Sequence, residues 1–312
     1  MTKIEKQGSA EQKVSIFLGI ILIIVICYGV PINILTIKTL LIRTSIRLKL
    51  MDKIIISLCV CNLVEIFPLF ILNAVACFKM KWLYGEKGCT IFSFWMNLTG
   101  NVSIWHLVAF AFEQRRGVSH NNIARPTWNY LSLWKQNLVL MLLWLQGFIW
   151  SILPVLGWGS YGLEGLEISC AVQWHQTDAE NLSYTITLFM VNFFIPATLL
   201  IFCYVDIFQR FKSRLNGISP AAVTIRAANH VRLRKLAKTG IFMTVSFFFA
   251  WMPYAGVALT TAILQRQLPP IVYSLPGVFA KCATITFATI IFRRRAAFNR
   301  QHIRPAGDIH IT

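Results

Sequence analysis

The stretch that decides the fold is Leu275-Pro-Gly-Val-Phe-Ala-Lys-Cys-Ala-Thr284, which places Lys281 inside an apolar run from Ile271 to Phe292. That run is long enough to cross a bilayer as one helix, at about 1.5 Å rise per residue. Lys281 falls near its middle, where a charged side chain costs about 2.5–3.5 kcal/mol on insertion scales. A lysine at that depth predicts a functional residue that has either a partner or a covalent role.

The composition of the chain indicates a membrane protein. Of its 312 residues, 56% are hydrophobic and 13% are charged, and the mean hydropathy is +0.60. Soluble domains are nearer a quarter charged. The net charge of +18 would suit nucleic acid, but the Lys and Arg residues cluster in short segments between apolar runs. We therefore expect contacts with membrane lipids and no nucleic-acid partner.

Hydropathy divides the chain into seven apolar stretches. They run roughly from Val14 to Ile42, Leu50 to Phe78, Gly88 to Phe112, Gln136 to Gly157, Tyr184 to Phe211, Leu236 to Leu264 and Ile271 to Phe292. In lipid only helices and closed barrels satisfy the backbone, so this spacing predicts an all-α membrane protein, a seven-transmembrane helix bundle. We expect one receptor-like domain at 14–292, a polar N-terminal tail at 1–13 and a basic tail at 293–312. The first stretch lacks a small-residue cleavage site, which favours a membrane helix over a signal peptide.

The distribution of basic residues predicts the orientation. Twenty Lys and Arg residues fall in the segments that would be inside if the N-terminus is outside, against seven in the outer segments. The positive-inside rule then places the N-terminus outside and the C-terminus in the cytoplasm. We expect a multi-pass protein of the plasma membrane.

Cysteine and glycosylation patterns follow from this orientation. Only Cys89 and Cys170 lie in candidate outer segments, so we expect at most one disulfide, which would tie the second outer loop to the top of the third helix. Of the N-x-S/T sequons, Asn97 and Asn101 fall inside the third stretch. Asn181 is the one plausible glycan site.

The basic segment from Arg293 to Arg300 admits two interpretations. It would form a short amphipathic helix on the anionic inner leaflet after the seventh span, with Phe298 on its apolar side. A plain stop-transfer cluster fits the charge pattern equally well.

The sixth stretch carries a proline and paired aromatic residues. Pro253 removes a backbone hydrogen bond and predicts a kink that would serve as a hinge. Trp251 and Tyr254 lie three residues apart and so share one helix face, where their rings would line a cavity. Periodicity alone favours ordinary aromatic packing.

Taken together, these residues resemble the rhodopsin-like G-protein-coupled receptors, and specifically the opsins. The receptor pattern is matched by Asn33, Cys89, Trp144, Pro196 and Trp251-Met-Pro-Tyr254. The opsin-like matches are Gly157-Trp-Gly-Ser-Tyr-Gly-Leu-Glu-Gly165 followed by Ser169-Cys170, Pro253-Tyr-Ala-Gly-Val-Ala258 and Pro276-Gly-Val-Phe-Ala-Lys281. The resemblance covers roughly residues 14 to 300.

This resemblance implies that Lys281 forms a Schiff base with retinal. Burial favours the free amine, which can attack an aldehyde. The protonated product is a buried cation that needs an anion. Glu164 is the candidate counterion, because Phe92 occupies the position where other opsins carry a carboxylate. If Glu164 does not serve, the Schiff base is expected to be unprotonated and to absorb at short wavelength.

The resemblance also implies further pocket residues and a switch. The pocket residues are Asn97, Gly100, Ser169, Phe193, Trp251 and Tyr254. Light would isomerise retinal, the strained ligand would push Trp251, and helix six would swing about Pro253.

The cytoplasmic half departs from the opsin pattern. The acidic-Arg-Tyr triplet is Glu113-Gln114-Arg115 here, which displaces the arginine by one residue, about 100° around the helix. The Asn-Pro-x-x-Tyr motif of helix seven is missing, and the family's helix-two aspartate is Asn62, while Tyr204 is retained. The implied retinal site is therefore intact and the implied G-protein switch is altered.

We expect a light-sensing receptor that couples to a heterotrimeric G protein and is not an enzyme. The alternative is a retinal photoisomerase or non-signalling retinal-binding protein, which would need Lys281 but not the inner motifs. A third hypothesis, a receptor for a diffusible ligand, is opposed by the retained Lys281. A transporter or channel is disfavoured because we expect no second intramembrane charge to pair with Lys281.

Overall fold

The computed structural model describes residues 3–43, 48–119, 132–176, 178–215 and 223–264, together with Val272 and Ser274. Six of the seven predicted spans fall in this part of the chain. The seventh, with Lys281, and the basic tail after it lie outside the described residues. The family comparison below bears on the bundle as a whole.

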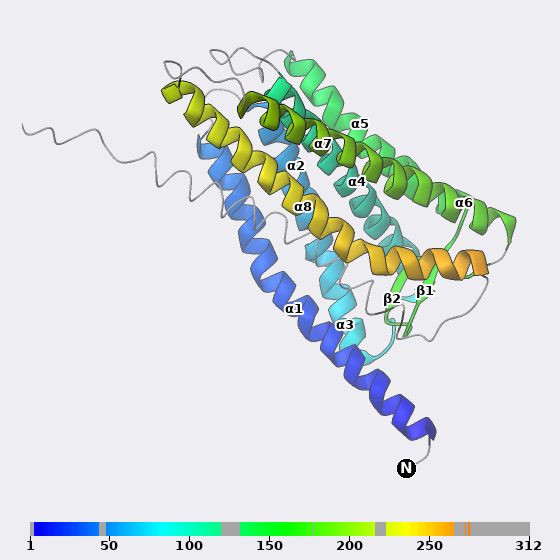
Figure 1. Cartoon of the computed structure of the whole chain (residues 1–312). Coiled ribbons are helices and arrows are strands. Elements are labelled where there is room, and N and C mark those ends of the chain that lie inside the picture. The colour runs from blue at the N-terminus through cyan, green and yellow to red at the C-terminus, as the bar shows by residue number, and fades with distance from the viewer. Residues whose placement is uncertain are drawn as a thin grey trace, which may run out of the picture.

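The described elements are long helices joined by short connections, with one small hairpin (Figure 1). In chain order they are α1 (Lys3–Arg43), α2 (Leu50–Val64), η1 (Glu65–Phe70), α3 (Ile71–Lys79), α4 (Gly85–Ser119), α5 (Leu133–Ile152), η3 (Leu153–Leu156), β1 (Tyr161–Glu164), β2 (Ser169–Val172), α6 (Ala179–Phe189), η4 (Met190–Phe194), α7 (Ile195–Leu215) and α8 (Val223–Leu264). The elements α2, η1 and α3 form the second predicted span, and α6, η4 and α7 form the fifth.

In the described part of the chain, five helical segments are long and apolar enough to cross a membrane, judged by length and composition. They are Gly8–Ile42, Leu50–Lys79, Leu133–Leu156, Ala179–Arg210 and Gly240–Leu264. The remaining predicted span is α4, which packs against α2, α5, α7, α8 and both strands. Because protein surrounds α4 on so many sides, that helix can carry more polar side chains than a helix that faces lipid.

Two helices extend beyond their predicted apolar stretches. The polar N-terminal residues, predicted as a tail, are helical from Lys3, and α8 begins at Val223, well before Leu236. Hydropathy marks where a helix is apolar, whereas the backbone hydrogen bonds that define the helix continue into polar sequence.

Prolines shape two of the spans. In η1, Phe67 leaves the helical region (φ −127°, ψ 99°) because the residue before a proline, here Pro68, is pushed toward extended backbone. Pro253 lies inside α8, and Figure 1 shows α8 changing direction in its orange C-terminal part, the part that holds this residue. The predicted hinge position therefore coincides with a bend.

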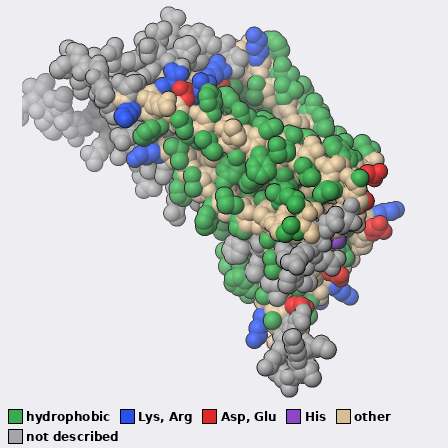
Figure 2. Space-filling model, turned by 45° about the vertical axis from the view of Figure 1, so that its right-hand side comes forward, with side chains coloured by type: hydrophobic (Ala, Val, Ile, Leu, Met, Phe, Trp, Pro, Cys, Tyr) green, Lys and Arg blue, Asp and Glu red, His purple; other side chains and the backbone are tan. Residues whose placement is uncertain are grey.

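The bundle has an apolar outer surface, and some polar contacts are buried between its helices. Figure 2 shows hydrophobic side chains covering the flank, with Lys and Arg gathered at its upper end. Phe249 and Phe208 are 80% and 68% exposed. Inside, Asn62 Nδ2 donates to Asn33 Oδ1 at 3.2 Å, both side chains being fully buried. A lipid solvent selects an apolar outer surface and requires that buried polar groups find partners between the helices.

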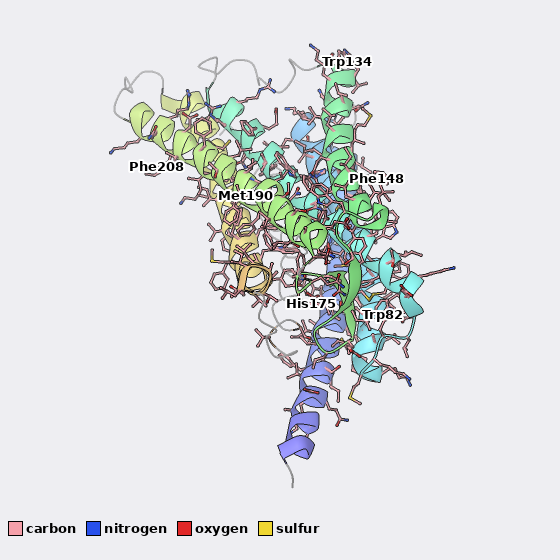
Figure 3. The ribbon with its side chains drawn as sticks, turned by 90° about the vertical axis from the view of Figure 1, so that its right-hand side faces the viewer. Trp82, Trp134, Phe148, His175, Met190 and Phe208 are labelled. Carbon is pink, nitrogen blue, oxygen red and sulfur yellow. A yellow bond between two sulfur atoms is a disulfide. The ribbon has the colours of Figure 1, made fainter. Side chains whose placement is uncertain are left out.

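A β-hairpin covers the outer end of the bundle. Strands β1 and β2 are antiparallel, with Glu164 opposite Ser169. Figure 3 shows Trp82 and His175 at this end of the molecule and Trp134 at the opposite end. The hairpin therefore closes the side of the bundle that the charge distribution assigns to the outside.

Candidate functional site

A cavity of about 90 Å³ lies inside the bundle beneath the hairpin. Its lining is mostly apolar and aromatic and comes from α4, α6, η4 and α8, with one residue from the segment after β2. The described lining residues are Met96, Asn97, Gly100, Asn101, Ile104, Trp174, Leu188, Phe189, Asn192, Phe193, Phe247, Trp251, Tyr254 and Ala255. An apolar cavity with a few polar groups is typical of a small-molecule site.

Gly100 and Trp251 approach each other in the lining of the cavity. A Cβ built on Gly100 would lie 3.6 Å from Trp251 Cη2, so the absent side chain leaves space beside the α4 backbone. Trp251 also stacks on Phe247, with ring centroids 5.7 Å apart and planes inclined by 25°. Its buried Nε1 has no hydrogen-bond partner among the described residues. The indole is therefore held by ring contacts, without a hydrogen bond from the described part of the chain.

Glu164 is linked to the cavity through two of its lining residues. Its Oε1 accepts hydrogen bonds from Tyr254 hydroxyl at 2.8 Å and from Trp174 Nε1 at 3.1 Å. The Trp174 and Tyr254 rings also meet edge to face, 5.6 Å apart. These contacts hold the half-buried carboxylate at the outer wall of the cavity.

Asn97 organises the wall between α4 and the hairpin. Its Nδ2 donates to the hydroxyls of Tyr161 at 3.1 Å and Tyr184 at 3.0 Å. Those hydroxyls in turn donate to the backbone carbonyls of Ser151 and Trp150 at the end of α5. Burial raises the pKa of Tyr161, in β1, so this hydroxyl remains a donor at any physiological pH.

A disulfide joins the hairpin to α4. Cys89 and Cys170 are bonded, with their Cα atoms 5.5 Å apart, and both side chains are buried. This confirms the single predicted disulfide. The bond fixes β2 to the outer end of α4. Ser169, which pairs with Glu164 across the hairpin, is fixed with it.

Most of the residues that the sequence predicts for the pocket lie around this one cavity. Asn97, Gly100, Phe193, Trp251 and Tyr254 line the cavity. Two others are not part of its described lining. Glu164 reaches it through Tyr254, and Ser169 lies on β2 opposite Glu164. Lys281 lies outside the described residues.

The prediction that no second intramembrane charge pairs with Lys281 stays untested, because Lys281 lies outside the described residues, but the sequence also carries an ionisable residue deep in another span. Glu65 lies in η1, near the middle of the second span, and is only 2% exposed. The signal was present in the sequence, because a lone carboxylate in the middle of the apolar run from Leu50 to Phe78 is as costly as Lys281.

At the cytoplasmic end, Arg115 points toward α7. Its Nε lies 2.6 Å from Asp206 Oδ2, and its guanidinium carbon lies 4.8 Å from the centre of the Phe202 ring. Arg210 Nε contacts the same Asp206 oxygen at 2.8 Å. Glu113 pairs instead with Arg116 on its own helix, at 2.8 Å. The displaced Arg115 is thus held by α7, which belongs to the fifth span.

Gln114 takes the position that faces α8. It is 3% exposed, and a Cβ built on Gly240 would lie 2.6 Å from its Oε1 and closer still to the Tyr204 hydroxyl. Gly240 thus allows α8 to approach α4 and α7 at this level. Gln114 and Tyr204, two residues singled out from the cytoplasmic motifs, thus both lie against α8 at Gly240.

The structure argues against the predicted glycan at Asn181. This side chain is 6% exposed, and its Nδ2, which would carry the sugar, donates to Gln176 Oε1 and to both carboxylate oxygens of Asp178, each at 2.9 Å. The hydrogen bonds from Asn181 hold the pKa of Asp178 below its usual range. Asp178 also caps the start of α6, because its carboxylate accepts a hydrogen bond from the Asn181 backbone N–H at 3.0 Å.

We therefore expect the chain produced in a glycosylating host to carry no glycan at Asn181. Peptide N-glycosidase treatment should leave its electrophoretic mobility unchanged. Asn181→Gln serves as the matched variant, because it removes the sequon while keeping an amide. A mobility difference between the two chains that glycosidase abolishes would contradict the expectation.

Comparisons with known proteins agree with this architecture. The family model described as 7 transmembrane receptor (rhodopsin family) matches residues 32–287. The crystal structure of squid rhodopsin superposes with a TM-score of 0.78 at 25% identity, covering 93% of this chain and 86% of that one. This match supports a seven-helix bundle, of which the described residues hold six spans.

Curated relatives point in the same direction. Melanopsin-A of Gadus morhua is 30% identical over 225 residues, which cover 70% of this chain but only 39% of that protein. Rhodopsin of Galeus melastomus is 28% identical over 262 residues, covering 82% and 71%. Blue-sensitive opsin of Conger conger is 29% identical over 263 residues, with the same coverage. The chain is therefore an integral multi-pass membrane protein that belongs to the rhodopsin family of seven-transmembrane receptors, among its opsin-like members.

Proposed function

We propose that this protein is a light-sensing receptor that binds retinal covalently through Lys281 and signals to a heterotrimeric G protein. One observation carries the proposal: an apolar, aromatic cavity lies beneath a disulfide-held hairpin, in a chain of the opsin-like family. Retinal supplies an aldehyde for a lysine amine and a polyene that absorbs light. The plasma membrane is the proposed location.

The residues of the cavity fit such a group. Gly100 leaves room for a flat chain beside α4, and the half-buried Trp251 ring can pack against it. The cavity volume of about 90 Å³ is below the roughly 300–1,000 Å³ of most small-molecule sites. Binding is therefore expected to move the lining rings, and Trp251, whose Nε1 has no hydrogen-bond partner among the described residues, is the ring we expect to move most.

Glu164, Trp174 and Tyr254 would control the polarity of the outer wall. Two donors on one carboxylate oxygen stabilise its charge while leaving it beside the cavity. The sequence-based proposal that Glu164 is a counterion is consistent with this position, with Tyr254 as the group between the carboxylate and the cavity.

Transmission to the cytoplasm would run along α8. Trp251 stacks on Phe247, and α8 continues from there to Gly240, where it meets Gln114 and Tyr204. A displacement of Trp251 would tilt α8 about the bend near Pro253 and open this contact. Movement of α8 away from α4 would separate Gly240 from the uncharged side chains of Gln114 and Tyr204. The ion pair between Arg115 and Asp206 joins α4 to α7, so it would stay in place.

The test is to express the chain, add 11-cis or all-trans retinal, and record spectra before and after illumination. A visible or near-ultraviolet pigment that changes with light is expected, followed by light-dependent nucleotide exchange on at least one class of G protein. Failure to form any pigment would overturn the proposal. A pigment that isomerises without nucleotide exchange would instead identify a non-signalling retinal binder or photoisomerase.

Gly240→Ala is expected to raise nucleotide exchange in the dark several-fold. The added methyl would overlap Tyr204 and approach Gln114 Oε1, and overpacking of this kind costs about 1–3 kcal/mol in the closed arrangement. Dark exchange rates of the variant and the unmodified receptor measure the effect. Gly256→Ala is the matched control, since a Cβ at that position of the same helix meets nothing within 4 Å. Equal dark rates in the two variants would contradict the argument.

A further inference from the structure

Two buried N–H groups in the cavity lining have no hydrogen-bond partner within the described part of the chain. They are Nδ2 of Asn192, on η4, and Nε1 of Trp251, on α8. The Asn192 side chain is 8% exposed. A buried donor of this kind has given up its hydrogen bonds to water, and it regains one only from a molecule that brings an acceptor. The lining therefore offers donors for which it supplies no acceptor.

The orientation of the Asn192 amide is fixed by a neighbouring helix. Trp105 of α4 donates its Nε1–H to Asn192 Oδ1 at 3.0 Å. An indole nitrogen can only donate, so turning the amide over would set two donors against each other. The amide oxygen must therefore face Trp105. The NH2 group is the polar group that Asn192 can offer to a molecule in the cavity.

Asn192 lies at the inner end of the cavity. Asn97 marks the outer end, because its Nδ2 donates to Tyr161 of the hairpin. Trp105 follows Asn97 on the same helix and lies about 12 Å deeper, at about 1.5 Å per residue. Asn192, which is bonded to Trp105, lies at that inner level. The Glu164 carboxylate and its two donors lie at the opposite end, in the outer wall.

Unmodified retinal does not supply the acceptor that this amide lacks. Its one oxygen belongs to the aldehyde and leaves as water when the carbon forms an imine with a lysine amine. The polyene and ring that remain are hydrocarbon, so they present only C–H groups to Asn192 whichever way they lie. A retinoid with an oxygen on its ring carries an acceptor at the end remote from the imine. A ring ketone suits the lining best, because it accepts hydrogen bonds and brings no hydrogen that needs an acceptor of its own.

We propose that the cavity prefers a retinoid whose ring carries an oxygen acceptor, and that Asn192 Nδ2 is the donor that recognises this oxygen. The choice of a retinoid rests on the proposed function; the donor at the inner end of the cavity does not. Asn192 is then a specificity-determining residue. Unmodified retinal binds less tightly, because it leaves the amide without an acceptor.

The experiment compares all-trans retinol with all-trans 4-oxoretinol, which differ by the ring ketone and carry no aldehyde for a lysine. Their Kd values are measured on the full chain in detergent, by displacement of radiolabelled retinol. We expect 4-oxoretinol to bind about 5- to 100-fold more tightly to the unmodified chain. In Asn192→Leu that ratio is expected to fall to about one. Partition of the ligands into micelles cancels when the ratio is compared between variants.

Asn73→Leu is the matched control for this change. It removes another buried amide, 1% exposed, whose Nδ2 has no hydrogen-bond partner among the described residues, but Asn73 lies on α3 and outside the described lining of the cavity. The full ratio is expected to remain. If Asn192→Leu does not fold, Asn192→Ala removes the same donor without adding bulk. A preference for 4-oxoretinol that survives the loss of Asn192 would overturn the proposal.

The remaining outcomes separate this proposal from the proposed function. Equal Kd values in the unmodified chain would show that water satisfies the amide, and they would overturn the ring preference even if retinal forms a light-sensitive pigment. Binding of neither alcohol would overturn it as well. A ring preference that depends on Asn192, in a chain that forms no pigment with retinal, would support this proposal while the covalent, light-sensing role fails.

Discussion

Lys281→Ala is expected to abolish pigment formation completely. Among all 30 basic residues, Lys281 is the one near the middle of an apolar stretch, so no other lysine amine is expected to reach a retinal aldehyde held inside the bundle. The measurement is the absorption spectrum after incubation with 11-cis or all-trans retinal. Borohydride reduction followed by mass spectrometry should place the retinyl group on the peptide that contains Lys281 in the unmodified protein.

The matched control for this change is Lys53→Ala. Lys53 lies near the cytoplasmic start of α2, where its Nζ donates to Asn137 Oδ1 at 2.8 Å. Its loss removes a lysine from a membrane helix far from the cavity, and a normal pigment is expected. Equal pigment yields from Lys281→Ala and the unmodified chain would refute the covalent role of Lys281.

The second large effect is expected from removal of the disulfide. The bond closes a loop between Cys89 and Cys170, which are 81 residues apart in sequence, and its loss should cost about 2–5 kcal/mol. The hairpin would then no longer be fixed to α4, so Glu164 and its contacts with Trp174 and Tyr254 should loosen. We expect Cys89→Ser/Cys170→Ser to show a much lower Tm and a strongly reduced pigment yield.

Thermal unfolding in detergent, with and without retinal, measures both consequences. Cys27→Ser is the matched control, because Cys27 is a free, exposed cysteine of α1. An unchanged Tm in the double variant would show that packing alone holds the hairpin in place.

The spans were predictable because hydropathy reports directly on burial in lipid. Six of the seven predicted stretches coincide with described helices, and α4 was found although its polar residues weaken the signal. The ends of α1 and α8 were not predictable, since their helical backbones continue into charged sequence. The single disulfide was predictable because only two cysteines fall in outer segments.

Neighbour relations between helices were harder to predict. The sequence shows that Arg115 is displaced by one residue, but only packing shows that it pairs with Asp206 and that Gln114 meets α8 at Gly240. Asn181 matches a glycosylation sequon, yet local contacts bury its amide. Sequons and motifs specify residue types, whereas accessibility depends on what packs around them.

The sequence by itself determined the membrane class, the orientation, the presence of a lysine near the middle of the last apolar stretch and the resemblance to opsins, because each depends on the order of residue types along one chain. The tertiary structure decided which side chains face one cavity, where Glu164 finds its donors, and that Glu65 is buried on the inner face of the second span. Those outcomes depend on how helices rotate and approach one another. The rotation and spacing of the helices are set by packing between segments that are distant in sequence, and no local sequence pattern records that packing.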